Sequence, residues 1–124
     1  MELNEISGAV VSGAFKIHTA LGPGLLESVY EACLEYELQR GGFQFARQRE
    51  LPVRYEGIEL PCGFRLDLIV EERMIVEVKA VERILPIHTA QLLTYLKLTG
   101  CQLGLILNFN VVHMRDGIKR IIST

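Results

Sequence analysis

The stretch FRLDLIVEERMIVEVKAV, residues 64–81, decides the fold because it contains two apolar strands joined by one short turn. Apolar residues alternate with other residues on both sides of residues 71–73, as in strands that bury one face. If both strands cover the same core, paired residue numbers must sum to an even value, so we predict a three-residue turn that pairs Val70 with Met74. The apolar set comprises Leu66, Leu68, Val70, Met74, Val76, Val78 and Ala80.

This register places Asp67 directly opposite Glu77, with Cβ atoms about 4.5–5.5 Å apart. Lys79 lies two residues beyond Glu77, on the same strand face. Two facing carboxylates resist joint ionisation, and a hard divalent cation such as Mg²⁺ removes that penalty. Such an ion polarises a phosphoryl oxygen and acidifies a water, while Lys79 orients the water or stabilises charge on the phosphate. The three residues predict metal-assisted phosphodiester hydrolysis, with Mn²⁺ as a possible substitute.

A second interpretation is a solvated network of surface charges, because exposed ion pairs are common and contribute little to stability. The apolar sequence around Glu77-Val78-Lys79 and the closely following helix at Pro86 count against it. Both interpretations stay open on the residues alone.

The composition fits one globular domain spanning residues 1–124, with 49% hydrophobic and 23% charged residues. The net charge of −2 argues against sequence-blind coating of nucleic acid, which relies on many cationic contacts. No apolar run reaches the roughly 18 residues of a membrane span. The acidic start of the chain does not resemble an export signal. We therefore expect a cytoplasmic protein without a membrane partner.

The rest of the pattern predicts an α/β (α+β) sandwich in which two helices come first and a third follows the central strands. Asn4 is the expected N-cap of the first helix. The helices are predicted at about 4–21, 25–40 and 86–99. The strands are predicted at about 43–50, 51–55, 58–60, 64–70, 74–81 and 103–109, followed by a hairpin of 111–115 and 118–122.

Three motifs together carry a family resemblance. Asp67 followed by Glu77-x-Lys79 on consecutive strands resembles the PD-(D/E)XK nuclease superfamily. Residues 24–30, GLLESVY, match the G-x-x-E-x-x-Y signature of the GxxExxY protein family. Residues 91–95, QLLTY, look like the Q-x-x-x-Y motif of the RecB-like branch. The likeness extends from about Ile6 to Ile122.

The resemblance implies a restriction-endonuclease-like αβββαβ core, with a central mixed sheet flanked by helices and the acidic pair on the central strands. It implies Asp67, Glu77 and the backbone carbonyl of Val78 as metal ligands. It also implies that Lys79 lies near the attacking water.

Further residues are implied around this centre. Glu27, in the signature, matches an additional metal ligand from the first core helix; its alternative is an exposed acid near a helix N-terminus. Gln91 and Tyr95 are implied to position the catalytic cluster or the substrate backbone. Strand alternation adds Arg65, two residues from Asp67, as a contact for the substrate backbone.

Three hypotheses about function follow. The first is a metal-dependent nuclease that hydrolyses DNA rather than RNA. The second is a non-catalytic module that keeps the nuclease fold and binds nucleic acid or a protein partner, which the small size and acidic charge favour. The third is a homodimer whose active unit needs two chains.

Overall fold

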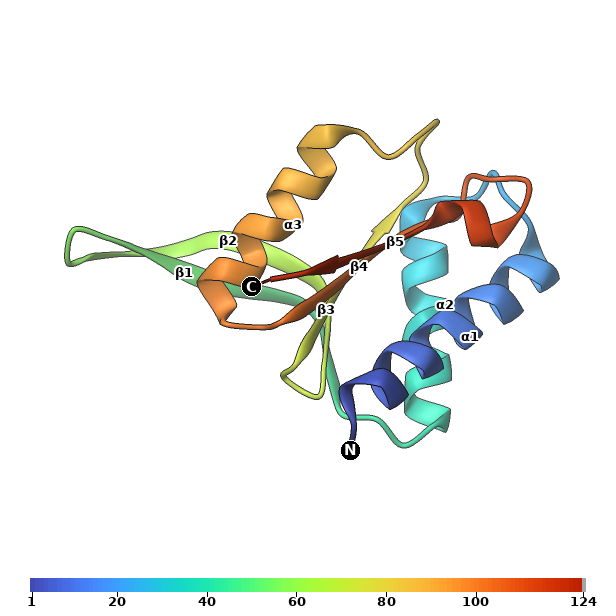
Figure 1. The fold of residues 1–124 in the computed structure, drawn as a ribbon, viewed down its shortest axis with the longest axis horizontal. Helices are drawn as coiled ribbons and strands as arrows, with labels where there is room; N and C mark the ends of the chain where they lie inside the picture. Colours follow the sequence, from blue (N-terminus) through green and yellow to red (C-terminus); the bar gives the residue numbers. More distant parts are fainter. Residues whose placement is uncertain (124) are drawn as a thin grey trace.

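Five strands form one mixed sheet in the computed structural model, which describes residues 1–123 (Figure 1). The strands lie in the order β1-β2-β3-β4-β5; only β3 and β4 are parallel. Two helices cover one face and a third covers the other. The predicted α/β (α+β) class, with a central mixed sheet flanked by helices, is confirmed. The strands are β1 (Phe45–Tyr55), β2 (Ile58–Val70), β3 (Met74–Lys79), β4 (Leu103–Asn108) and β5 (Ile118–Ile122).

The helices lie close to their predicted positions: α1 (Leu3–Leu21), α2 (Glu27–Arg40) and α3 (Pro86–Thr99). The prediction of Asn4 as an N-cap is wrong, because α1 begins one residue earlier and Glu2 takes that position. The Asn4 side chain instead accepts a hydrogen bond from Arg120 of β5. None of the helices in the described residues is long and apolar enough to cross a membrane.

The predicted register of β2 and β3 is confirmed, since Val70 pairs with Met74 and Leu68 pairs with Val76. The turn closes through a hydrogen bond of 3.0 Å from the Arg73 amide to the Val70 carbonyl. Glu71 and Glu72 both take left-handed backbone conformations, with φ of 54°. The turn therefore brings the two odd-numbered carboxylates to the same level of the sheet.

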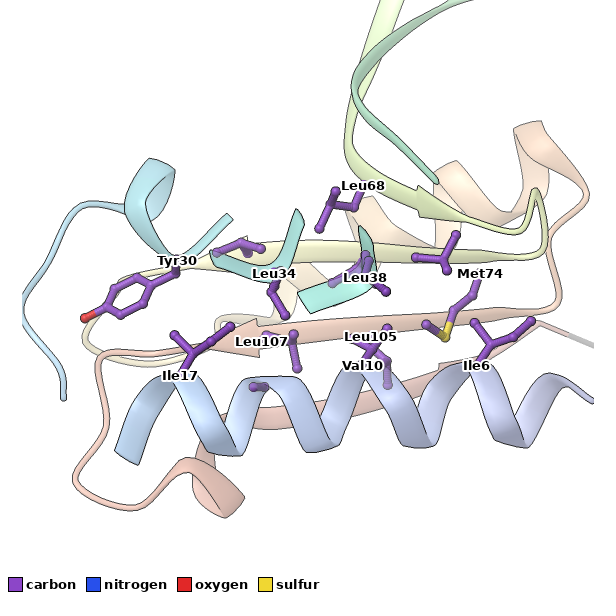
Figure 2. Close-up of a cluster of buried hydrophobic side chains, with 14 of the residues drawn as sticks. Ile6, Val10, Ile17, Tyr30, Leu34, Leu38, Leu68, Met74, Leu105 and Leu107 are labelled. Carbon is purple, nitrogen blue, oxygen red and sulfur yellow. The ribbon is translucent and has the colours of Figure 1, made fainter. Parts of the chain in front are cut away.

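Each face of the sheet has its own core. Figure 2 shows the larger core, where Ile6 and Val10 of α1 and Leu34 of α2 pack against Leu68 and Leu105 of the sheet. The smaller core lies under α3 and contains Leu66, Ile69, Ile75, Leu92, Leu96, Cys101, Ile106 and Ile121. Leu66 lies in this core and Leu68 in the other, which contradicts the prediction that they share a face. The ladder between β1 and β2 lacks the pair that would lie between Arg47–Leu68 and Arg49–Leu66.

The middle of the chain forms two long strands where four shorter segments were predicted. β1 and β2 meet at the predicted Glu56-Gly57 turn, and both central residues have positive φ. The hairpin extends past the end of β3 and projects from the sheet (Figure 1). It carries a register shift between Leu51 and Val53. The projecting end has no third strand beside it, which explains its exposed side chains.

Of the predicted C-terminal hairpin, the strand at 118–122 is confirmed as β5, but the strand at 111–115 and the pairing of the two are wrong. Residues 114–117 form a 3₁₀ helix whose Met114 is buried in the larger core, and β5 pairs with β4 instead. The Val111 carbonyl lies 2.7 Å from Nε2 of His18, so it is not available to a strand ladder. Gly117 approaches the Asn108 carbonyl so closely that an added Cβ would lie 2.0 Å from that oxygen.

Replacing Gly117 with alanine is expected to destabilise the protein by about 3 kcal/mol, because overpacking against a backbone atom leaves little room to relax. Urea denaturation measures the effect. Gly8→Ala is the matched control, since nothing lies within 4 Å of its added Cβ in α1. That change should stabilise the protein by up to about 1 kcal/mol. Equal stabilities for the two variants would contradict the close approach of Gly117 to Asn108.

Candidate active site

The site lies where β2 separates from β3. The ladder between these strands ends at the pair Leu68–Val76, and the next pair would be Asp67 and Glu77. There the side chains take over the hydrogen bonding. The Asp67 amide donates to Oε2 of Glu77 over 3.0 Å, and the Val78 amide donates to Oδ2 of Asp67 over 2.8 Å. Each of the two carboxylates is therefore fixed in place by an amide of the facing strand.

Burial makes both acids reluctant to ionise. The Glu77 residue is only 6% exposed, and burial, with the nearby Asp67 charge as a second cause, raises its pKa to about 8. Burial also raises the pKa of Asp67, an effect that the hydrogen bond from the Val78 amide partly offsets. The surroundings of Asp67 and Glu77 therefore disfavour a state in which both carboxyl groups are ionised.

Lys79 supplies the nearest cation on the strand. It is half-buried at the end of β3, and its charge acts to lower the pKa of both Asp67 and Glu77. Within residues 1–123, its ammonium group takes part in no hydrogen bond or ion pair closer than 4.0 Å. The amine is therefore available to a water or an anion beside the acidic pair.

The chain that follows Lys79 is held by side chains from two elements. Oε2 of Glu27, in the first turn of α2, accepts a hydrogen bond of 3.0 Å from the Ala80 amide. The buried Asn108 side chain accepts from the Val81 amide and donates to the Val81 carbonyl, over 3.1 and 3.0 Å. These bonds replace a strand ladder and fix the direction in which β3 ends.

Comparison with known protein families gives a match that covers almost the whole chain. A model of the PD-(D/E)XK nuclease superfamily matches residues 4–121. The chain belongs to the PD-(D/E)XK nuclease superfamily. Membership suggests a nuclease and implies a nucleic acid as its substrate. The comparisons with curated proteins and with solved structures found no match.

In this PD-(D/E)XK domain, α3 contributes the pair Gln91 and Tyr95. Nε2 of Gln91 donates a hydrogen bond of 2.8 Å to the Tyr95 hydroxyl. The Tyr95 ring stacks on Phe64 of β2, with ring centroids 5.0 Å apart. Burial and, after it, the charge of Glu77 raise the Tyr95 pKa, which places this phenol within electrostatic range of the acidic pair. Tyr95 thus packs against β2 and lies close enough to the acids for their charge to affect its pKa.

Arg65 lies on the surface of the same PD-(D/E)XK domain. Its neighbours Phe64 and Leu66 both pack in the core under α3, so the Arg65 side chain points away from that core. It is exposed and pairs across the ladder with Glu50. Contact between Arg65 and a substrate remains a prediction.

Sequence reasoning missed Glu31, a carboxylate of α2 that is only 4% exposed. Its Oε1 accepts hydrogen bonds from Nε of Arg47 over 2.8 Å and from Nε2 of Gln48 over 2.6 Å. The charge of Glu31 also raises the pKa of Asp67. A signal was present, because Glu31 lies four residues after Glu27 and therefore on the same helix face.

The donor set of this PD-(D/E)XK domain fits a divalent cation. Asp67 and Glu77 each use one carboxylate oxygen on a backbone amide, which leaves Oε1 of Glu77 and Oδ1 of Asp67 for a ligand, the latter beside Nε2 of Gln48 at 3.5 Å. Within residues 1–123, no group of three or more His, Cys, Asp or Glu side chains is arranged to hold a metal. Mg²⁺ commonly takes only one or two carboxylates and completes its shell with water and phosphate oxygens. Two acids with raised pKa values suit such an ion.

The raised pKa of Glu77 predicts a pH dependence of stability. The unfolded chain releases this proton near pH 4.5 and the folded protein near pH 8, so stability falls as the pH rises between these values. Glu77→Gln removes the charge, keeps an oxygen for the Asp67 amide, and should abolish this part of the fall. At pH 8 the variant should exceed the parent by at least about 1.4 kcal/mol, the equivalent of one pKa unit.

Urea denaturation in EDTA at pH 5 and pH 8 measures this difference. Glu59→Gln is the control, because Glu59 is exposed on the projecting hairpin and the substitution there should leave the pH dependence unchanged. Parallel pH profiles for the parent and Glu77→Gln would show that burial of Glu77 does not hold its proton.

Proposed function

We propose that the protein is a Mg²⁺-dependent nuclease that hydrolyses phosphodiester bonds, with DNA preferred to RNA. One observation carries the proposal: the buried Glu77 and the half-buried Asp67 converge at the end of the β2–β3 ladder, with Lys79 two residues further along β3. A solvated network of surface charges does not account for this burial. Carboxyl groups whose pKa values are raised by burial are typical of functional sites.

In this proposal, Asp67, Glu77 and the Val78 carbonyl hold the ion. The bound Mg²⁺ would supply the charge that polarises a phosphoryl oxygen and acidifies a water. Lys79 holds the attacking water by hydrogen bonding, or stabilises negative charge on the phosphate, because its amine has no protein partner among the described residues. The backbone amides of Asp67 and Val78 each fix one oxygen of a carboxylate, which limits rotation of both acids.

Glu27 has a double role in this proposal. Its Oε2 already holds the Ala80 amide, which fixes the strand just after Lys79. Its other carboxylate oxygen would serve as an additional ligand of the ion, as the G-x-x-E-x-x-Y signature implies. We assign the chain to the GxxExxY group of the RecB-like branch on the strength of that signature and of the Q-x-x-x-Y motif in α3.

The substrate contacts are assigned to the surface beside the acids. Gln91 and Tyr95 are hydrogen-bonded to each other and lie on α3 near Glu77, so they suit the positioning of the catalytic cluster or of a sugar–phosphate backbone. Arg65 is an exposed cation two residues from Asp67. The preference for DNA rests on the resemblance to the RecB-like branch.

A second candidate is a non-catalytic binding module that retains the fold. The observation that favours it is the neutralisation of arginines on β1. Arg47 pairs with Glu31 at 2.8 Å, Arg49 with Glu72 at 2.6 Å, and Arg54 with Glu59 at 3.5 Å. These cations are already engaged with carboxylates, which weakens the electrostatic attraction to nucleic acid.

A nuclease assay separates the candidates. Single-stranded and double-stranded DNA and RNA are incubated with the protein and Mg²⁺ or Mn²⁺, beside Glu77→Gln and Lys79→Ala. The parent should cleave DNA faster than RNA and lose activity in EDTA. Each variant should lose activity by a factor of about 10² or more, the range for removal of one preorganised charge or donor. Glu5→Gln, at an exposed acid of α1, serves as the surface control.

Cleavage that survives both substitutions would end the assignment of the site. Nucleic-acid binding without cleavage by the parent under either metal would instead support a nucleic-acid-binding module. Neither binding nor cleavage would support a module that binds a protein partner.

A further inference from the structure

Gln48 of β1 has a backbone conformation that its residue type rarely adopts. Its φ is 54°, in the left-handed region, although it lies within a strand. The pairs on either side, Arg47–Leu68 and Arg49–Leu66, are regular, so the residue opposite Gln48 is Asp67. That pair alone is missing from this part of the ladder. The irregularity of β1 therefore lies at the position of the acid that ends the β2–β3 ladder.

This conformation has an energetic cost for a residue with a Cβ, on the order of 1–2 kcal/mol. Such strain persists only where the surroundings hold the residue in place, and it is concentrated at functional sites. Positive φ at residues other than glycine also occurs at Glu56, Cys62, Glu71 and Glu72. The conformation therefore locates the irregularity of β1, and the side-chain contacts of Gln48 indicate its role.

The Gln48 amide lies between two carboxylates. Its Nε2 donates a hydrogen bond of 2.6 Å to Oε1 of Glu31, and lies 3.5 Å from Oδ1 of Asp67. One primary amide has two N–H groups and can direct one to each acid. Oδ2 of Asp67 is meanwhile occupied by the Val78 amide. Both oxygens of Asp67 thus face a donor, and rotation of the carboxylate would break both contacts.

Attachment of α2 to β1 does not by itself require Gln48. Arg47 already links the same strand to Glu31 with its Nε, at 2.8 Å, and to the Ser28 carbonyl at 3.4 Å. It also lies 3.7 Å from Glu35. What Gln48 adds to this link is its contact with Asp67.

We propose that Gln48 is a positioning residue, which orients the Asp67 carboxylate from the strained position on β1 and is itself anchored by Glu31. The inference rests on the proposed function, because it assigns Gln48 to the geometry of that same site. Glu31 is the fixed end of the relay, since it is buried on α2 and bound by Arg47. Gln48 contacts Asp67, the acid that we assign to metal binding.

Two variants separate orientation of Asp67 from simple attachment of α2. Gln48→Gly removes the amide and relieves the left-handed strain, so the melting temperature should stay equal or rise. The double variant Glu31→Gln/Gln48→Glu exchanges donor and acceptor. It keeps a hydrogen bond between α2 and β1 but presents a carboxylate, without a donor, to Asp67.

Three readouts are measured on the parent and both variants. The first is hydrogen exchange of the Val78 amide by NMR, with the buried Ile75 amide of β3 as an internal reference. This readout needs neither metal nor substrate. The second is the Mn²⁺ dissociation constant by electron paramagnetic resonance. The third is the separation of kcat from KM for DNA cleavage.

The proposal predicts that, in both variants, Val78 exchange rises about tenfold relative to Ile75 and Mn²⁺ binding weakens about tenfold, as for loss of about 1.4 kcal/mol. It predicts a fall in kcat with little change in KM. Unchanged Val78 exchange in Gln48→Gly, or parent-like behaviour of the double variant, would overturn it. If the parent protein cleaves no substrate, the proposed nuclease function is wrong. Hydrogen exchange of the Val78 amide still tests whether Gln48 orients Asp67.

Discussion

The structure depends on how two backbone amides are satisfied where β2 leaves β3. Buried amides need partners, and the strand that would supply them has turned away. The carboxylates of Asp67 and Glu77 supply them instead, each bonded to the amide of the facing strand. The acids that we assign to metal binding are thus also the groups that end the ladder. This double use explains how side chains from separate strands keep one fixed spacing without a third element between them.

The same arrangement places charge where the fold does not favour it. Burial raises the pKa of both acids, and the backbone amides that bond them, together with the charge of Lys79, only partly offset this rise. A stable fold alone would be better served by amides or apolar residues at these positions. Conflict between stability and site chemistry is common at functional sites. Here it points to a cation from outside the chain as the missing partner of the pair.

Much of this could be predicted from residues 64–81, because the apolar residues require paired residue numbers with an even sum, and a three-residue turn then gives the register of β2 and β3. Local signals also fixed α3, which begins at Pro86 and ends before Gly100. The β1–β2 turn was found from its Glu-Gly pair. These features share a cause: each is determined by residues close together in the chain.

The features that sequence reasoning missed depend on contacts between distant segments. Nothing local marks Gln48 for a left-handed conformation, since it follows from Asp67 and Glu31 on other elements. The prediction of a C-terminal hairpin was wrong because His18 and Asn108 approach the backbone of that loop and impose another path.

The central claim is that Asp67 and Glu77 converge to hold one divalent ion. Its most direct test is a crystal soaked in Mn²⁺, with the ion located by anomalous scattering. The account predicts one peak within coordination distance, about 2.0–2.2 Å for ions of this kind, of an oxygen from each carboxylate. Mn²⁺ bound elsewhere in the molecule, with Asp67 and Glu77 still bonded only to the facing amides, would contradict it.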